Sequence, residues 1–319
     1  MSEPAAPQLP PQLPARAKGR NGLLWGILAA VVVIAIVVVL VAVNASKSAG
    51  ATAAKTVTIG TSDASQPSWS VYKKLAKQKY DVNVKLVNFS DYSQPNPALA
   101  QKQIDLNEFQ HIEFLAVYNV TNQQDIQPIG ATMTVPLPLY SFKYKSVAEL
   151  PAGAKVAIPN DQVNQARGLL VLQSAGLVTL KGGGSAFSTV NDITSKKVSI
   201  ETLDAAQTAV ALKNDAVAAS IINNNYATSA KIPQSDVIAK DDPSSAAAQN
   251  YVNFFAARKA DIHNKLYLEL AELYHDKRVE AAAAKESGGS AVFSKLTPAQ
   301  LQAQLKKTEA DARAAGVGK

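Results

Sequence analysis

The segment Leu23–Val43 limits most strongly what this chain can become, because it contains 21 consecutive residues without a charge. At about 1.5 Å per residue, a helix of this length spans about 30 Å, the thickness of the hydrocarbon core of a bilayer. The segment has no polar face, which a helix on the surface of a globular domain would show. Trp25 lies near its start, where an indole ring suits the membrane interface. The sequence therefore predicts one N-terminal transmembrane helix.

The residues on either side of this segment predict its orientation. Residues 1–22 are rich in proline, and Arg16, Lys18 and Arg20 lie close to the membrane edge. Because basic flanking residues stay in the cytoplasm, we expect residues 1–22 to form a cytoplasmic tail and everything after Val43 to lie outside. Residues 44–55 are mostly small and polar, as in a flexible linker. The expected product is a single-pass protein of the cell membrane with an extracytoplasmic domain.

A cleaved signal peptide is the alternative interpretation of the same segment. Val43-Asn44-Ala45 resembles a cleavage site with small residues. The apolar core of a signal peptide is usually about 7–15 residues long, so the length of this segment favours a retained signal anchor. Both interpretations place residues 46–319 outside the cytoplasm.

The composition excludes several kinds of site. The chain has no cysteine, which excludes disulfides, thiolate metal sites, a thiol nucleophile and a lipid attached to cysteine. Its three histidines are far apart, and His263 and His275 lie in a Lys- and Glu-rich stretch that predicts exposed side chains. The net charge of +7 is not clustered as a nucleic-acid-binding surface requires. Common nucleotide-binding, zinc-protease and serine-nucleophile motifs are missing, so we expect no catalytic residue, metal or cofactor.

From residue 56 onward, short β-branched runs alternate with amphipathic stretches. The expected strands are 56–60, 82–89, 104–106, 155–158, 198–202, 217–222 and 251–258, and the expected helices are 68–79, 95–102, 112–118, 163–175, 205–212, 262–284 and one introduced by Thr297-Pro298. This alternation favours parallel sheets covered by helices on both faces, an α/β fold. A chain of this length usually forms two lobes, and a late strand can return to complete the first, which leaves a cleft between them.

Aromatic residues around one histidine form the first candidate site. Phe109, His111 and Phe114 are spaced around the start of an expected helix. They fit either a core cluster with a hydrogen-bonded histidine or the aromatic wall of a small-molecule pocket. Tyr92, just after the second expected strand, is either part of the same site or a loop residue packed against its neighbours.

Polar residues that could hold an amino acid form the second candidate site. Arg167 lies early in a helix for which Asp161 is the expected N-cap, and it shares a face with apolar residues. It either clamps a ligand carboxylate or forms an internal ion pair. Asn223-Asn224-Asn225 follow a buried strand, where ligands bind in open α/β sheets, although a turn with left-handed backbone is the alternative, most of all for Asn224. Guanidinium, amides and aromatics together describe an amino-acid site.

Five motifs in register resemble one known family. They are Ser90–Asn96, Asp105–His111, Ala157–Asp161 with Asn164 and Arg167–Leu170, Ile222-Asn223 with Tyr226-Ala227, and Asn250–Asn253. Their order is similar to that in the NlpA-type, methionine-binding substrate-binding proteins of ABC importers. The resemblance runs from about residue 56 to about residue 258 and continues more weakly through the terminal helices.

The resemblance implies a two-lobed, type II periplasmic-binding-protein fold that closes on methionine. Lobe 1 would comprise residues 56–138 and 251–319, and lobe 2 residues 139–250, with hinges near Pro136–Ser141 and Tyr251–Ala256. The implied partners are an ABC permease and its ATPase subunit. The implied ligand-binding residues are Tyr92, Phe109, His111 and Phe114 as cleft walls, Arg167 as the carboxylate clamp, and Asn223 and Asn253 as polar contacts.

Three departures from the family pattern affect what is expected. The lipid-bearing cysteine typical of the family is missing, so the helix at Leu23–Val43 would replace it as the anchor. Phe114 stands where relatives often have Tyr, and Asn224 where Gly is common. A different amino acid or a short methionine-containing peptide therefore stays open as the ligand. A sensory or adhesive ectodomain of the same fold, or an exported enzyme, stays open as the function.

Overall fold

The computed structural model describes residues 55–319, which form one compact unit. The predicted tail, the segment Leu23–Val43 and nearly all of the linker lie outside the described residues. Among the helices of the described part, none combines the length and the apolar character that crossing a bilayer requires. Two five-stranded sheets, each covered by helices on both faces, make up this part of the chain.

The first sheet has the strand order β2-β1-β3-β13-β4. Its strands are β1 (Lys55–Thr61), β2 (Val82–Asn88), β3 (Leu106–Asn107), β4 (Ile126–Ala131) and β13 (Phe254–Arg258). Helices α2 (Pro67–Tyr80), α8 (Lys265–Leu273) and α9 (Lys277–Glu286) cover one face, and α3 (Pro95–Ala100), α4 (Ile112–Asn122) and α10 (Pro298–Ala314) cover the other. Thr297 caps α10 through its side chain, as the sequence predicts.

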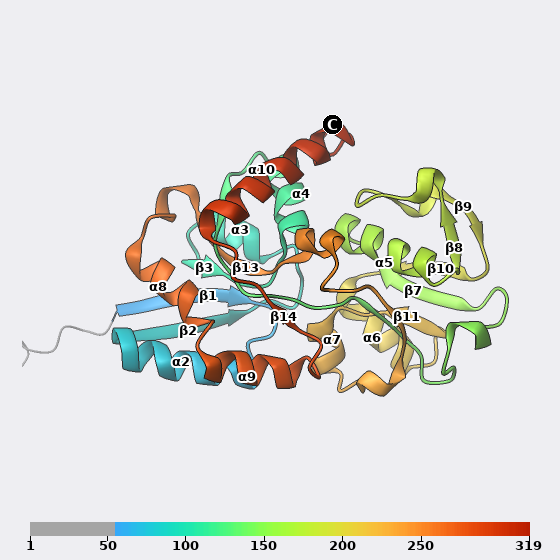
Figure 1. Ribbon diagram of the computed structural model, residues 1–319, viewed down its shortest axis with the longest axis horizontal. Coiled ribbons are helices and arrows are strands. Elements are labelled where there is room, and N and C mark those ends of the chain that lie inside the picture. The colour runs from blue at the N-terminus through green and yellow to red at the C-terminus, as the bar shows by residue number, and fades with distance from the viewer. Residues whose placement is uncertain (1–54) are drawn as a thin grey trace, which may run out of the picture. The chain divides into compact units, whose positions relative to one another are not determined.

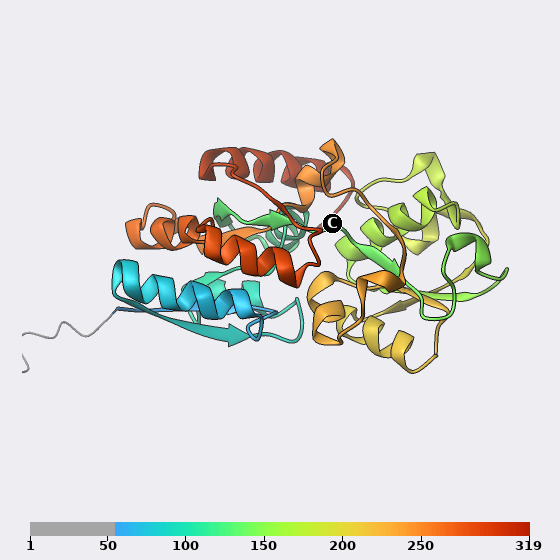
Figure 2. The same cartoon turned by 60° about the horizontal axis from the view of Figure 1, so that its bottom comes forward.

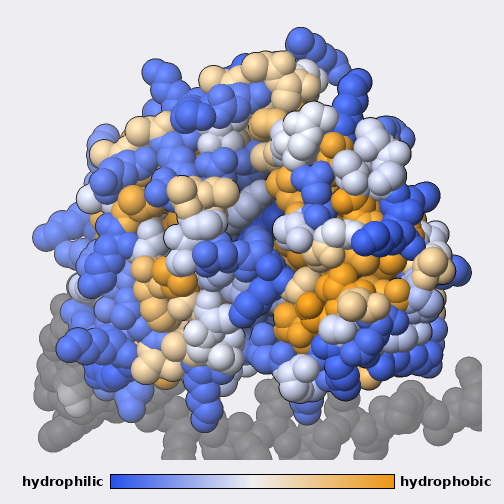
Figure 3. Space-filling model, turned by 45° about the vertical axis from the view of Figure 1, so that its right-hand side comes forward, coloured by the Kyte–Doolittle hydropathy of each residue, from blue (hydrophilic) through white to orange (hydrophobic). Residues whose placement is uncertain are grey.

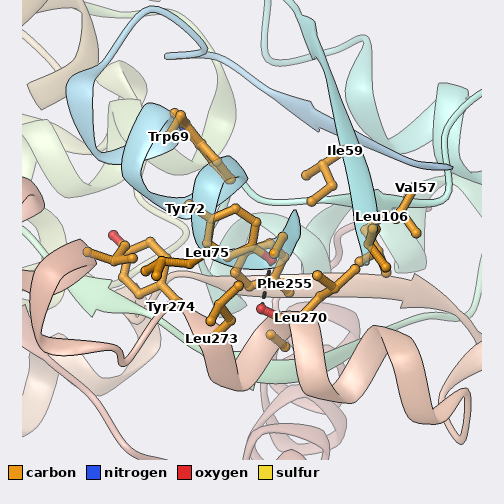
Figure 4. Close-up of a cluster of buried hydrophobic side chains, with 14 of the residues drawn as sticks. Val57, Ile59, Trp69, Tyr72, Leu75, Leu106, Phe255, Leu270, Leu273 and Tyr274 are labelled. Carbon is orange, nitrogen blue, oxygen red and sulfur yellow. Dashed lines mark hydrogen bonds between the residues drawn. The ribbon is translucent and has the colours of Figure 1, made fainter. Parts of the chain in front are cut away.

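The alternation of side chains along β13 joins both cores of this sheet. Phe255 and Ala257 point to the side of α2 and α8, whereas Phe254 and Ala256 point to the side of α4 and α10. On the first side, the rings of Tyr72 and Phe255 stack with centroids 5.9 Å apart, and the Tyr72 hydroxyl donates to the backbone oxygen of Leu270 (Figure 4). A strand buried on both faces thus anchors helices from both ends of the domain.

The second sheet has the strand order β10-β7-β11-β6-β12. Its strands are β6 (Pro138–Tyr140), β7 (Lys155–Pro159), β10 (Ser199–Leu203), β11 (Ala219–Ile221) and β12 (Val237–Lys240). Helix α5 (Gln162–Ser174) packs on one face, and α6 (Ala205–Lys213) and α7 (Asn224–Ser229) pack on the other. Two short ribbons complete the described part: β5 (Met133–Thr134) with β14 (Val292–Phe293), and β8 (Val178–Leu180) with β9 (Ile193–Lys196).

The expectation of parallel sheets holds only in part, because both sheets are mixed. β13 runs antiparallel to β3 and β4, and β6 runs antiparallel to β11 and β12. Each of these strands enters its sheet from a segment that crosses between the sheets, so no strand–helix–strand unit sets its direction. The chain makes these crossings at residues 135–137 and 241–253. In both ribbon views, residues 138–240 lie at one end and the flanking elements at the other (Figure 1, Figure 2).

The expected helix at 262–284 is two helices, α8 and α9. The break falls at His275-Asp276, because the Asp276 side chain accepts from the backbone nitrogen of Arg278 and starts α9 as its N-cap. The last expected strand also begins later, at Phe254, since Tyr251 ends a 3₁₀ helix at Ala246–Tyr251. Most other predicted elements agree with the structure to within a few residues.

Apolar side chains are not spread evenly over the surface of the described part. Figure 3 shows apolar side chains gathered over one part of the visible face, with hydrophilic residues around them. Over residues 55–319, the exposed large hydrophobic side chains are those of Phe142, Val210 and Val292. The other large apolar side chains of the described part are at least partly covered.

Three buried amides hold the loop between β3 and α4 in place. The Gln110 Nε2 donates to Asn96 Oδ1 at 2.7 Å and to Asn107 Oδ1 at 3.1 Å, and Asn96 Nδ2 donates back to Gln110 Oε1 at 2.7 Å. All three side chains are at most 2% exposed, so water cannot replace a lost partner. The motif residues between Pro95 and His111 therefore build the scaffold of this loop.

Replacement of Gln110 by Ala should lower the free energy of unfolding by about 1–3 kcal/mol, because it leaves the buried Asn96 Nδ2 and Asn107 Oδ1 without partners. Urea unfolding of the full-length protein in detergent measures the change. The exposed Gln103→Ala serves as the matched control and should change stability by less than about 0.5 kcal/mol. Equal effects of the two substitutions would contradict this role for the amide network.

Candidate functional site

A cleft between the two sheets gathers the predicted site residues. It encloses about 690 Å³ of empty space, the open space at its mouth included. Its walls are formed by Ser62, Asp63, Tyr92, Glu108, Phe109, Gln110, His111, Phe114, Met133, Val135, Asn164, Arg167, Asn223, Asn224, Asn225 and Asn253. All seven residues expected to bind a ligand are among them.

Three aromatic rings form the apolar part of the cleft. Tyr92 precedes α3, Phe109 lies in the loop after β3, and Phe114 is in the first turn of α4. Their ring centroids are 5.8 to 6.1 Å apart, and Phe114 meets both other rings edge to face. Edge-to-face and tilted contacts at such distances stabilise aromatic clusters. The rings therefore form one continuous apolar wall suited to an uncharged side chain.

His111 is both the N-cap of α4 and a polar group of the cleft. Its Nδ1 accepts from the backbone nitrogen of Phe114 at 3.3 Å, which leaves Nε2 as the nitrogen that carries the proton. Burial and the nearby Arg167 guanidinium hold the pKa of His111 well below its usual value. The ring is therefore neutral at physiological pH and offers a hydrogen-bond donor without a charge.

Arg167 has the internal ion pair that the sequence left open and also lines the cleft. Its Nε donates to Asp241 Oδ2 at 2.7 Å, and its Nη2 donates to the backbone oxygen of Val135 at 2.8 Å. The guanidinium carbon lies 4.0 Å from the ring centroid of Tyr251. Asp161 caps α5 by accepting from the backbone nitrogen of Asn164, which confirms the predicted N-cap. The Nη1 group has no hydrogen-bond partner among the described residues and is free to donate to a ligand.

The asparagines of the cleft carry unpaired polar atoms. Asn223 Nδ2 donates to Asn164 Oδ1 at 2.8 Å, while the buried Asn223 Oδ1 has no partner in the described part. Asn224 starts α7, and its backbone is outside the left-handed region, so the alternative of a left-handed turn does not apply to this position. Its buried Nδ2 is also without a partner among residues 55–319. Unpaired buried amide atoms are costly, so these atoms favour a polar ligand.

Asn253 connects the cleft to the first sheet. Its backbone nitrogen and its Nδ2 both donate to the Met133 oxygen, at 2.8 and 3.2 Å, and its backbone oxygen accepts from Thr132. The side-chain oxygen is not used by any described residue. From the residues alone, this position reads as an ordinary strand residue, and only the family resemblance singles it out.

Two carboxyl groups in the cleft wall, those of Asp63 and Glu108, were missed by the sequence analysis. Glu108 is 7% exposed, and burial together with the nearby Asp63 raises its pKa to about 8. Burial also raises the pKa of Asp63, against hydrogen bonds from Thr61 and Trp69 that lower it. Asp63 follows the carboxyl end of β1, so the rule that drew attention to Asn223 would also have found it. Glu108 lies inside the motif that contains Phe109 and His111.

Hydrogen bonds join the two walls of the cleft. The Tyr226 hydroxyl donates to the Ser90 oxygen at 2.9 Å, and Asn225 Nδ2 donates to Ser62 Oγ at 3.3 Å. The Tyr92 hydroxyl also donates to Asn225 Oδ1. Asn225 and Tyr226 belong to α7 of the second sheet, whereas their partners follow strands of the first.

The prediction that His275 is an exposed surface histidine is wrong. Its side chain is only 10% exposed, with Nδ1 2.8 Å from Glu280 Oε1 and Nε2 2.9 Å from the Ala131 oxygen. The break between α8 and α9 turns this residue inward against β4. Among residues 55–319, no group of three or more His, Asp or Glu side chains is arranged to hold a metal ion.

The fold and the cleft define a small-molecule-binding protein of the mixed α/β class. A model of the NlpA lipoprotein family matches residues 57–294, and the chain belongs to this family. The probable D-methionine-binding lipoprotein MetQ of Vibrio cholerae serotype O1 is 39% identical over 225 residues, which cover 70% of this chain and 81% of the relative.

Solved structures agree with this assignment. Protein PG110 of Staphylococcus aureus has a TM-score of 0.74 at 38% identity, covering 79% of this chain and 99% of that protein. A nutrient-binding protein of Burkholderia cenocepacia, solved bound to methionine, has a TM-score of 0.69 at 37% identity and covers 75% of this chain and 99% of its own.

The raised pKa of Glu108 predicts a stability that depends on pH. A carboxyl with a folded-state pKa of about 8 and an ordinary value of 4.5 contributes stability below pH 4.5, which is lost as the pH rises toward 8. Thermal unfolding should therefore show Glu108→Gln gaining on the unmodified protein between about pH 5 and about pH 8. The other ionisable groups contribute equally to the pH dependence of both proteins. Parallel pH profiles of stability for the two proteins would therefore contradict the prediction.

Proposed function

We propose that this protein is an extracytoplasmic solute-binding protein that captures methionine for an ABC importer. The observation that carries the proposal is the convergence of the aromatic wall, Arg167 and the amides of Asn223 and Asn253 on one cleft. Its relatives support the same ligand, since one is named a probable D-methionine-binding lipoprotein and a structural neighbour was solved bound to methionine. The protein performs no reaction of its own in this proposal.

Each end of methionine has a complementary part of the cleft. The apolar thioether side chain lies against Tyr92, Phe109 and Phe114, where aromatic rings and sulfur make favourable contacts. The free Nη1 of Arg167 and the Nε2 of His111 donate to the ligand carboxylate. The unpaired side-chain oxygen of Asn223 and the side-chain amide of Asn253 make polar contacts with the amino-acid end of the ligand.

We further infer that binding closes two lobes of a type II periplasmic-binding-protein fold. Lobe 1 comprises residues 56–138 and 251–319, and lobe 2 comprises residues 139–250. Closure is a hinge motion at the two crossings, near Pro136–Ser141 and Tyr251–Ala256. The hydrogen bonds between α7 and the loops at Ser62 and Ser90 belong to the closed arrangement. Docking on the permease, powered by its ATPase subunit, then opens the cleft and releases the ligand.

The membrane attachment proposed for this chain differs from that of its relatives. Their names describe lipoproteins, whereas this sequence contains no cysteine to carry a lipid. The uncharged segment Leu23–Val43 supplies the anchor instead, with the N-terminus in the cytoplasm. A short linker after it keeps the binding domain at an effective concentration on the order of mM near the transporter.

Calorimetric titration of the full-length protein in detergent against the twenty amino acids tests the ligand. Both enantiomers of methionine and a methionine-containing dipeptide belong in the same series. Methionine should bind, and Arg167→Ala should weaken binding by about 2–5 kcal/mol if the carboxylate is desolvated beside it. Arg278→Ala, which removes an exposed arginine paired with Asp276 on α9, is the matched control and should bind normally. No binding of methionine at mM concentration, or a loss below about 0.5 kcal/mol in Arg167→Ala, would count against the assigned roles.

Membrane fractionation tests the anchor. The protein should sediment with membranes and resist extraction by high salt, because a 21-residue apolar helix inserts through the hydrophobic effect and not through charge. Two Asp residues placed at Val32 and Ala35 should release it, since each buried charge costs about 2.5–3.5 kcal/mol on insertion scales. Recovery of the unmodified protein from the medium, shortened at residue 45, would instead establish a cleaved signal peptide.

A further inference from the structure

One wall of the cleft carries a carboxyl group without a counter-ion. Glu108 is 93% buried, its Oε1 accepts from the Thr132 hydroxyl at 3.0 Å, and its second oxygen has no hydrogen-bond partner among the described residues. The same side chain lines the cleft. Asp63 lines it too and uses one oxygen to accept from Thr61 and Trp69.

The charged groups of the cleft leave these two acids uncompensated. Within residues 55–319, neither carboxyl forms an ion pair with Lys, Arg or His. Arg167, the cation of the cleft, is engaged by Asp241, and His111 is neutral. A buried carboxylate is costly unless a cation or several donors meet it. The cleft therefore has a place for a positive group on the wall built by the first sheet.

We propose that Glu108, together with Asp63, binds the ammonium group of the ligand and so selects zwitterionic amino acids over acids that lack the amine. The inference rests on the proposed function, because it assigns one end of the same ligand. Arg167 reaches the cleft from α5 of the second sheet, and Glu108 from the first. A ligand held at both ends bridges the two walls, so its two charges couple recognition to closure.

The amide oxygens of Asn223 and Asn253 compete for the same role. An ammonium bound to a carboxylate makes a charge-assisted hydrogen bond, about twice as strong as one to a neutral oxygen. The carboxyl groups of Glu108 and Asp63 are also stabilised in their ionised form by a bound cation, whereas the amides of Asn223 and Asn253 are neutral with or without one. The two possibilities differ in what happens to a ligand whose ammonium is replaced by a hydroxyl.

Among the described residues, the ionisable groups around Glu108 include no cation, so a bound ammonium would change the protonation state of Glu108. The groups that face it are Asp63 from the loop after β1, Tyr72 from α2 and Tyr274 from the end of α8. Asp63 in turn faces Glu286 of α9. None of these groups is a cation, and burial together with the Asp63 carboxyl raises the pKa of Glu108 to about 8, which keeps it largely protonated near neutral pH. A bound ammonium favours the ionised form, so binding releases a proton and strengthens between about pH 6 and about pH 8.

Calorimetry of the full-length protein with methionine and its α-hydroxy analogue tests the proposal. In Glu108→Gln, the affinity for methionine should fall by about 10- to 100-fold, while that for the hydroxy analogue should be unchanged or stronger. Titrations in two buffers of different ionisation enthalpy should show that the unmodified protein releases up to about one proton and that Glu108→Gln releases almost none.

Two further variants keep the result interpretable. Asp63→Asn should produce a smaller loss of the same selectivity, and it replaces Glu108→Gln if that variant does not fold. Glu113→Gln removes a carboxyl that is 1% exposed on α4 and outside the cleft, and it should leave both affinities unchanged.

Equal losses for the two ligands, or no loss for methionine, would overturn the ammonium assignment while leaving methionine binding intact. Failure of the unmodified protein to bind methionine would instead overturn the proposed function. The ammonium assignment would then be tested on whichever amino acid the protein does bind, with the matching α-hydroxy acid as the probe. Binding of none of the twenty amino acids would overturn both.

Discussion

The ion pair between Arg167 and Asp241 is the interaction on which the arrangement of the two sheets depends. Arg167 belongs to α5, but its partners come from both segments that cross between the sheets: Val135 from the first, and Asp241 and Tyr251 from the second. Asp241 also accepts from the backbone nitrogen of Leu137. A guanidinium buried to this degree needs a counter-charge, and Asp241 supplies it, so the geometry of both crossings is tied to one side chain in the cleft wall. A change in the position of Arg167 on ligand binding would therefore act directly on both crossing segments.

Local signals in the sequence predict most of the single elements and, apart from Asn253, the residues expected at the site, all of which line the cleft. The apolar face around Arg167 marks it as unusual, and Asp161 is recognisable as a cap from its neighbours alone. The sequence does not show which residue pairs with each buried charged group. Asp241 is 74 residues from Arg167, and Thr132 is 24 from Glu108, so only the folded chain shows which charges are compensated. The mixed sheets and the inward-facing His275 have the same cause, since both follow from long-range placement and not from local pattern.

The motifs that suggest a ligand site serve two purposes in the structure. Phe109 and His111 face the cleft, whereas Asn96 and Asn107 lie in the buried amide network, with Gln110 in contact with both. A binding loop with a polar face needs such support, because its backbone is not held by a long strand. The motif is therefore recognisable as one block, although only part of it meets the ligand. Similarity to relatives within this motif therefore reflects the residues that hold the loop in shape as well as the residues that contact the ligand.

The position of β13 determines the order in which the chain can complete its sheets. This strand lies between β3 and β4, so β4 has no neighbour in the first sheet until residues 254–258 have been synthesised. The second sheet, by contrast, draws all its strands from residues 138–240 and can pair as soon as these are available. When the chain is synthesised from its N-terminus, the second sheet can therefore be completed before the first, although the first sheet contains the earliest strands. Long-range pairing of this kind slows folding and leaves strand edges exposed meanwhile, which makes the interval before β13 arrives the period of greatest risk of aggregation.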